Sequence, residues 1–185
     1  MFLPIEIKTS FLGKSLVYSV PLEDKMNAYM RIDFGNECKD EHYIVWVDSA
    51  KFLALCKQDP ISAEPRILSE TYEQDRKFHK AAKGFLHGQS NPVPLAKVVC
   101  KTEIVNKYEY KKRFLLPDKV IGFKEETLVY CGFIDGITRT MWLLSKGASF
   151  FPVHCLSNNG ARLLYDNCGV GEFTSLKKLA DNYYT

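Results

Sequence analysis

The stretch Phe133-Ile134-Asp135-Gly136-Ile137-Thr138-Arg139-Thr140-Met141-Trp142 indicates a strand that runs directly into a helix through Asp135-Gly136. The first N–H groups of a helix have no partner inside the helix, and the positive end of the helix dipole lies beside them. A glycine at such a junction allows a ligand to approach the backbone closely. These features together predict a pocket for an anion such as phosphate.

Side chains around this junction extend the predicted pocket. Arg139 in the first helical turn offers a planar fork of donors that suits a phosphate group. Thr138 and Thr140 add hydroxyls, and Asp135 at the mouth could position a water or a Mg²⁺ ion, so Asp135 and Arg139 are the candidate catalytic residues. The alternative interpretation is a plain connection, with Asp135 as the helix N-cap and Arg139 in solvent.

On both sides of this junction, the pattern of apolar residues predicts short strands that alternate with short helices. The helix after the junction runs over 137–146 and ends at Gly147, because Ile137, Met141 and Leu144 fall on one face. Further strands are expected near 5–7, 16–20, 42–47, 93–100, 127–134 and 149–155, and further helices near 49–57, 70–83 and 161–168, with a last one capped by Thr174. The layout predicts an α+β fold.

Composition limits the classes of function. The chain has 185 residues, of which 46% are hydrophobic and 25% charged, so it is long enough for one globular domain and too apolar for wholesale disorder. It contains no apolar run long enough to span a membrane and no secretory signal, so we expect a soluble cytoplasmic protein without membrane insertion. The net charge of +3 is too small to identify a nucleic-acid-binding protein by itself.

Cysteine spacing gives no metal site. The six cysteines are scattered, and four of them lie inside apolar runs, where a free thiol behaves as a small hydrophobe. Cys38 and His42 are four residues apart but have no second pair, and His154 and Cys155 are neighbours on a predicted strand, so their side chains point to opposite faces. Metal ligands therefore stay unassigned.

A basic and aromatic segment is the second functional candidate. Lys107-Tyr108-Glu109-Tyr110-Lys111-Lys112-Arg113-Phe114 interleaves cations with rings. Lys107, Lys111, Lys112 and Arg113 could hold DNA phosphates while bases stack on the tyrosines. The alternative is an edge or loop whose rings pack on the core and whose lysines are solvated. Lys77, Lys80 and Lys83, on a predicted helix, are expected to form a solvated face.

The order of these motifs resembles the ParB/sulfiredoxin superfamily. The predicted helix 70–83, Gly88 and the Pro92-Val93 strand resemble its first conserved box, and the Asp-Gly-x-x-Arg turn, Gly147 and Pro152-Val153 resemble its second. The resemblance covers about 66–155 and implies a single compact domain over 1–185, with a mixed sheet, surrounding helices, and 1–65 and 156–185 as elaborations. It also implies that Gly136, Thr138, Arg139 and Thr140 bind a nucleotide phosphate.

Two departures narrow the implied function. Sulfiredoxins carry Cys-His where this chain has Ile137-Thr138, so the thiol that their repair chemistry needs is missing. Partition-type ParB proteins continue into a helix-turn-helix domain, and only 30 residues follow Cys155. The chain most resembles the branch of plasmid fertility inhibition factors.

The resemblance to that branch implies an enzyme that hydrolyses ATP, with Mg²⁺ as a candidate companion ion, and that cuts DNA. The implied role is to block conjugative transfer through type IV secretion, with the transferred DNA and the coupling machinery as partners, in the bacterial cytoplasm. Two alternatives differ in chemistry. One is a non-catalytic, nucleotide-gated protein that occludes the transfer machinery, and the other is a nucleotide-gated DNA-binding module that does not cut.

Overall fold

Two mixed sheets share one core in the computed structural model, which describes residues 4–10, 13–34, 42–59, 71–114 and 116–183. The first sheet has the order β1-β2-β3-β5, with β1 (Glu6–Ser10), β2 (Gly13–Pro21) and β3 (Asn27–Phe34) antiparallel. The short β5 (Val93–Pro94) pairs with β3 in parallel.

The second sheet has the order β7-β6-β8-β4-β9 and carries the predicted phosphate turn. Its members are β4 (Tyr43–Asp48), β6 (Ala96–Arg113), β7 (Leu116–Asp135), β8 (Phe150–Cys155) and β9 (Thr174–Ser175). β6 and β8 are parallel, whereas the other neighbours are antiparallel. The α+β class and the mixed sheet expected from the sequence are confirmed.

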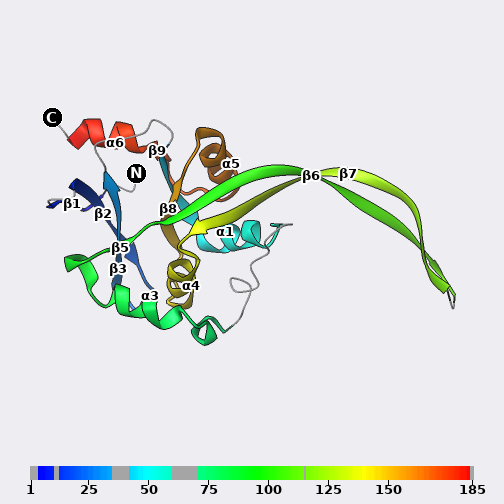
Figure 1. Ribbon diagram of the computed structural model, residues 1–185, viewed down its shortest axis with the longest axis horizontal. Coiled ribbons are helices and arrows are strands. Elements are labelled where there is room, and N and C mark those ends of the chain that lie inside the picture. Colours follow the sequence, from blue (N-terminus) through cyan, green and yellow to red (C-terminus); the bar gives the residue numbers. More distant parts are fainter. Residues whose placement is uncertain (1–3, 11–12, 35–41, 60–70, 115, 184–185) are drawn as a thin grey trace.

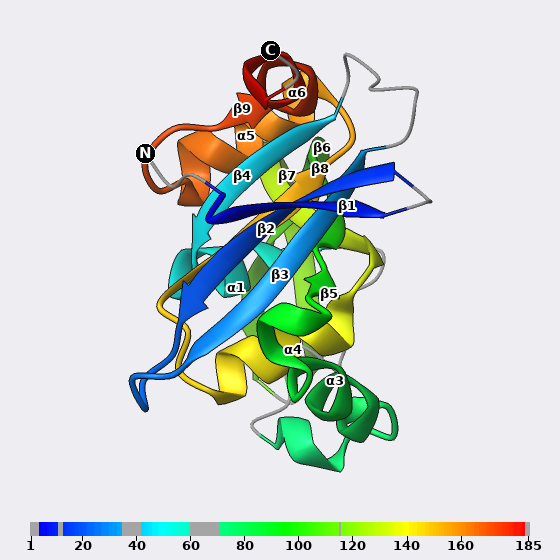
Figure 2. The same ribbon diagram turned by 90° about the vertical axis from the view of Figure 1, so that its left-hand side faces the viewer.

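Helices cover the outer face and one end of the second sheet. α1 (Ser49–Cys56) and α5 (Asn158–Cys168) pack on the face opposite the first sheet, whose strands cross the other face (Figures 1 and 2). α3 (Phe78–Phe85) and α4 (Ile137–Ser145) lie together at one end, and α6 (Leu176–Tyr183) closes the chain. None of the helices in the described ranges combines the length and apolar content that crossing a bilayer requires.

The core joins the sheets through large apolar side chains. Tyr18 of β2 and Trp46 of β4 meet edge to face, with ring centroids 6.0 Å apart. Phe52 of α1 contacts the rings of Phe133 and Phe151 in the same T-shaped manner. Burial of these rings away from water is the main force that holds the layers together.

A long two-stranded arm projects from this body. β6 and β7 pair antiparallel from Lys97↔Asp135 to Arg113↔Leu116, and most of that ladder extends beyond the other strands (Figure 1). Large apolar side chains on it are exposed, including Ile104, Tyr110 and Phe123. The sequence predicted two separate strands, 93–100 and 127–134, and did not predict the arm that connects them.

The first-box helix is shorter than expected. Ser69 and Glu70 lie outside the described residues, Tyr72–Gln74 form a single 3₁₀ turn, and α3 begins only at Phe78. The predicted end near residue 83 is also wrong. The helix continues to Phe85 because that ring is buried and stacks on Trp142 of α4, at 4.0 Å between centroids and 13° between planes.

Other differences concern strands and caps. β3 was not predicted from the sequence, although Ala28, Met30 and Ile32 are buried at alternate positions. α5 begins at Asn158, because the Ser157 hydroxyl accepts a hydrogen bond from the Gly160 N–H at 3.1 Å. Ser175, not Thr174, accepts the corresponding bond at the start of α6, from the Lys178 N–H at 3.1 Å.

Candidate functional site

The predicted phosphate turn is formed where β7 passes into α4. Gly136 is the N-cap of α4 and has φ 91° and ψ 11°, a left-handed conformation that side chains other than glycine rarely adopt. A Cβ at this position would also lie 2.7 Å from the Ala96 Cα atom. Glycine is therefore required at this position for two reasons: its φ is positive, and a side chain would clash with the start of β6. Asp135, predicted as an alternative N-cap, is instead the last residue of the strand.

Arg139 is bound to the protein rather than exposed to solvent. Its Nη2 pairs with the Asp135 carboxylate, and its Nη1 donates to the Pro94 carbonyl at 2.7 Å and to that of Leu95 at 3.4 Å. Only 15% of its side chain is exposed. The guanidinium thus ties the second box to the β5–β6 connection, and the alternative that placed Arg139 in solvent is wrong.

Asp135 is ionised by its surroundings. Burial alone would raise its pKa, but the Arg139 guanidinium, the Gly136 N–H and Lys97 together lower the pKa below its ordinary value. A carboxylate with a lowered pKa is a poor proton acceptor near neutral pH. Its suitable roles are to orient a neighbouring group and to compensate charge.

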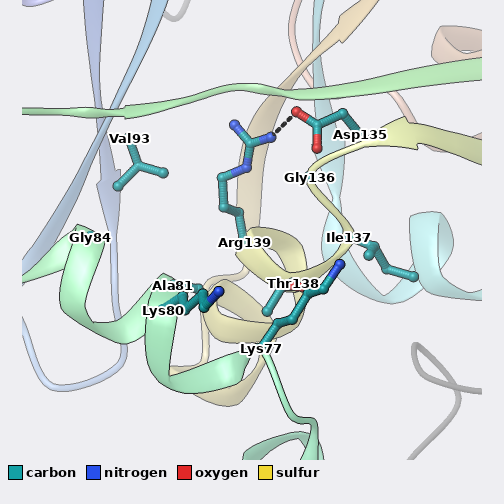
Figure 3. Close-up of a pocket in the computed structure, with 10 residues that line it drawn as sticks. All are labelled: Lys77, Lys80, Ala81, Gly84, Val93, Asp135, Gly136, Ile137, Thr138 and Arg139. Atoms are coloured by element: carbon teal, nitrogen blue, oxygen red, sulfur yellow. Dashed lines mark hydrogen bonds and ion pairs between the residues drawn. The ribbon is translucent and has the colours of Figure 1, made fainter.

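A cavity of about 300 Å³ opens beside this turn (Figure 3). Its polar lining comes from Asp135, Thr138 and Arg139 on one side and from Lys77 and Lys80 of the α3 region on the other. The two lysines, which were predicted to lie on a solvated face, lie beside the start of α4 (Figure 3). The cavity therefore joins a helix N-terminus with two flexible cations, which is a suitable arrangement for a phosphate group.

The two threonines of the first turn lie in different places. Thr138 is half-buried and lines the cavity. Thr140 is buried, and its hydroxyl donates back to the Gly136 carbonyl at 3.3 Å. Thr140 is therefore used to stabilise the helix start, and its hydroxyl does not face a ligand in this cavity.

The four cations of the basic segment lie on the arm, far from the turn. Lys107, Lys111, Lys112 and Arg113 are all exposed residues of β6. Lys107 forms an ion pair with Glu126 at 3.3 Å, and Arg113 donates to the Pro117 carbonyl at 3.1 Å. The tyrosines of the segment are exposed on the arm as well, so the alternative that packs them on the core is wrong.

The register places the opposed lysines and the rings on opposite faces of the arm. Lys107 lies opposite Lys124, and Lys111 lies opposite Lys119, so these lysines share one face. Tyr108 lies opposite Phe123 on the other face, with ring centroids 6.2 Å apart. A nucleic-acid strand on the lysine face therefore does not reach Tyr108 and Phe123, and the ring face offers it Lys112 as the one cation of the predicted four.

The cysteines and histidines form no metal site within the described ranges. The five cysteines within the described ranges are buried and free, and burial raises the pKa of Cys100 to about 12. No group of three or more metal-ligating side chains is placed to hold an ion in the described ranges, and Cys38 lies outside them. His42 and His154, 112 positions apart in the sequence, stack with ring centroids 4.8 Å apart, a contact that no motif predicted.

Comparison with known proteins adds the family. The sequence model of the plasmid fertility inhibition factors matches residues 44–169, which is more than half of the chain and includes the turn, the cavity and the arm. The chain belongs to this family. Protein Osa of Shigella flexneri is 27% identical to this fertility inhibition factor over 170 residues, which are 90% of this chain and 75% of Osa.

A solved structure shows the same fold. It is the oncogenic suppression activity protein, a plasmid fertility inhibition factor crystallised as a gold(I) cyanide derivative. The match has a TM-score of 0.66 at 24% identity and covers 97% of this fertility inhibition factor and 82% of the solved chain.

Proposed function

We propose that this fertility inhibition factor hydrolyses ATP at the turn between β7 and α4 and cuts DNA bound along the cationic face of its arm. The proposed consequence is that plasmid DNA no longer reaches a type IV secretion channel. The observation that carries the proposal is the cavity beside Gly136, where Lys77 and Lys80 face the N-terminus of α4.

The cavity supports nucleotide binding through its donors. The positive end of the α4 helix dipole and the two lysine ammonium groups suit the oxygens of a triphosphate. A Mg²⁺ ion bound with the nucleotide would take most of its ligands from phosphate and water, with Asp135 as the carboxylate at hand. In hydrolysis a water adds to the γ-phosphorus, the bond to the bridging oxygen breaks, and ADP, phosphate and a proton are released.

The arm supports DNA binding through its charge. Lysines that lie directly opposite one another repel, and the arm has two such pairs, Lys107 with Lys124 and Lys111 with Lys119. A polyanion lying on that face removes the repulsion. The face is long and narrow, as expected for contact with a nucleic-acid backbone rather than with a small ligand.

A second candidate function uses the same site without chemistry. Arg139 and Asp135 are bound to each other and to the backbone, so a nucleotide at the turn could act on the β5–β6 connection and thereby on the arm. In that case ATP gates binding of DNA or of the transfer machinery, and no bond is broken. Turnover distinguishes the two candidates.

The test measures ATP affinity, ATP turnover and cleavage of linear DNA on highly purified protein. A Lys77→Ala, Lys80→Ala double variant should weaken ATP binding by roughly 10- to 100-fold, the value of a charge-assisted contact. Lys83→Ala is the matched control, because Lys83 is an exposed lysine of the same helix and does not line the cavity.

Equal ATP affinity in wild type and double variant would refute the site. If wild type binds ATP but releases no phosphate and leaves DNA intact, the gating function replaces the enzymatic one. Because trace contaminants mimic both activities, the double variant must lose them after the same purification.

A further inference from the structure

A second cavity, of about 440 Å³, lies next to the phosphate turn and shares only Asp135 and Arg139 with the first. Its other polar lining comes from Arg31 and Asp33 of β3, Lys97 of β6, His42 and His154. We call it the histidine cavity. It brings together both sheets and the start of α4.

The strand register explains how this cavity is assembled. Asp135 of β7 lies directly opposite Lys97 of β6, and Lys97 lies opposite His154 of β8. Residues directly opposite in neighbouring strands point to the same face of a sheet. Asp135, Lys97 and His154 therefore form one row across the sheet, which starts at the ion pair with Arg139.

His154 is the unusual member of this row. The side chain is buried, at 5% exposure, and within the described residues its Nε2 atom has no hydrogen-bond partner. Buried polar atoms are nearly always paired, because leaving one unpaired costs free energy. Since the imidazole lines the cavity, a ligand there is able to provide the missing partner.

The charges around the cavity favour an anionic ligand. Arg31 pairs with Asp33 at 3.0 Å and Arg139 pairs with Asp135, so both guanidinium groups are compensated. Lys97 takes part in no ion pair among the described residues, although it helps to lower the pKa of Asp135, so three cations and two carboxylates leave the cavity one positive charge in excess. A neutral imidazole donates one N–H, so Lys97 and His154 together offer a cation and a hydrogen-bond donor on one row.

We propose that the histidine cavity binds a phosphate group, separate from the nucleotide phosphates at the turn, through Lys97 and His154. A tetrahedral phosphate oxyanion has enough acceptors for both donors and leaves others for His42 and Arg31. The group has two candidate sources. It is either a phosphodiester of a bound DNA strand or the free phosphate released from a nucleotide.

The proposal stands apart from the enzymatic function, since binding of free phosphate requires no turnover. It predicts a signature at His154. Burial, with smaller contributions from His42 and Lys97, lowers the pKa of His154 to about 4, so the ring is neutral at pH 7. A bound anion favours the charged form, so the pKa of His154 should rise when the cavity is filled.

The experiment follows histidine ring resonances of the full-length, ¹⁵N-labelled protein during titration with inorganic phosphate at pH 7. His154→Gln identifies the resonance, and the wild-type titration does not depend on how that variant folds. We expect a saturable shift at His154. Lys97→Ala should weaken phosphate binding by roughly tenfold, while Lys101→Ala, an exposed lysine further along the same strand, should leave it unchanged.

Other arms of the experiment identify the source of the phosphate. A short oligodeoxythymidine without terminal phosphates that shifts His154 at lower concentration than inorganic phosphate assigns the cavity to DNA. A shift with inorganic phosphate only assigns it to the released product.

Absence of a saturable shift at His154 overturns the proposal. So does phosphate binding that persists in Lys97→Ala but disappears in the Lys77→Ala, Lys80→Ala variant, because it would then occur at the turn. If instead the double variant loses ATP binding and keeps the His154 shift, the two sites are separate, as proposed. If ATP does not bind at the turn, the phosphate titration followed at His154 still tests the histidine cavity.

Discussion

Arg139 connects the functional turn with the stability of the fold. Its guanidinium pairs with Asp135 of its own turn and donates to the Pro94 and Leu95 carbonyls, so it joins the turn to a segment about 45 residues earlier in the sequence. An arginine suits this position because one planar group reaches several acceptors at fixed angles. Both cavities have Arg139 in their lining.

Arg139→Ala should therefore affect folding as well as ligand binding. Two backbone carbonyls and one carboxylate lose their donor, which should lower the free energy of unfolding by about 1–3 kcal/mol. Since a domain of this size is stable by about 5–15 kcal/mol, the variant should still fold. Urea unfolding monitored by tryptophan fluorescence measures the change, and stability equal to wild type would contradict the contacts described for Arg139.

His154 should make the protein sensitive to acid. Its pKa is about 4 in the folded state, below the ordinary value of 6.5, so under acidic conditions the unfolded chain binds the extra proton. Stability should fall as the pH drops from about 6.5 to 4, by up to about 3 kcal/mol for this group. In His154→Gln the free energy of unfolding should depend less on pH over that interval, and an identical pH profile would contradict the prediction.

The sequence revealed part of this chemistry. Gly136 and the residues after it could be predicted, because a strand, a glycine and a helix follow one another directly. The histidine cavity could not, because His42, Lys97 and His154 come together only through the pairing of β4, β6 and β8. The spacing of Lys77 and Lys80 correctly predicted that they share one face of a helix. The packing of α3 against α4, which the sequence does not show, places that face beside the start of α4.

At the scale of secondary structure, the arm is the element whose two faces differ. Its cationic face contains Lys107, Lys111, Lys119 and Lys124 together with Glu109 and Glu126, and its other face contains Tyr108 and Phe123. An isolated pair of strands is marginally stable in water, and opposed lysines weaken it further. A ligand that neutralises the lysines should therefore also stabilise the arm.

Because the structure shows which lysines share a face of the arm, DNA binding can be tested with variants on one face and a control on the other. Lys111→Ala with Lys119→Ala removes one opposed pair, and the slope of log affinity against log salt should become shallower by roughly 1.4 to 1.8. Lys112 follows Tyr110 at alternate spacing on β6 and belongs to the aromatic face, so Lys112→Ala should change the slope little. Fluorescence anisotropy with labelled DNA over a series of salt concentrations provides the measurement.

Lys178→Ala on α6 is a control for net charge, because it removes an exposed cation from the body. An equal slope in wild type and the Lys111→Ala, Lys119→Ala variant would show that DNA does not bind this face of the arm.

Sequence patterns predicted most helices and strands but not the length of β6 and β7. Residues 101–126 lack a buried face, so no apolar alternation marks them as strands. They are strands because the two segments pair with each other, and such pairing leaves no local pattern in the sequence. The helix 70–83 was overestimated for the opposite reason, since its charge pattern suits a helix while the packing of Phe85 on Trp142 determines where α3 lies.

At the scale of the whole molecule, the body should fold without the arm. Val105 lies opposite Glu126, so residues 106–125 can be replaced by an Asn-Gly turn that keeps this pair in register. The deletion removes no buried core residue. Its melting temperature should stay within a few degrees of wild type, and ATP affinity should be retained while DNA affinity falls. Calorimetry and the binding assays above test both statements, and an unfolded body would contradict them.

The length of β6 also sets a spacing on any DNA that the protein holds. Its 18 residues, at about 3.3 Å each, place the tip of the arm ~55 Å from the turn. That distance corresponds to about 16 base pairs of duplex at ~3.4 Å per pair. Because the arm extends to one side only (Figure 1), the footprint that the protein protects on DNA should be asymmetric about the position of the turn.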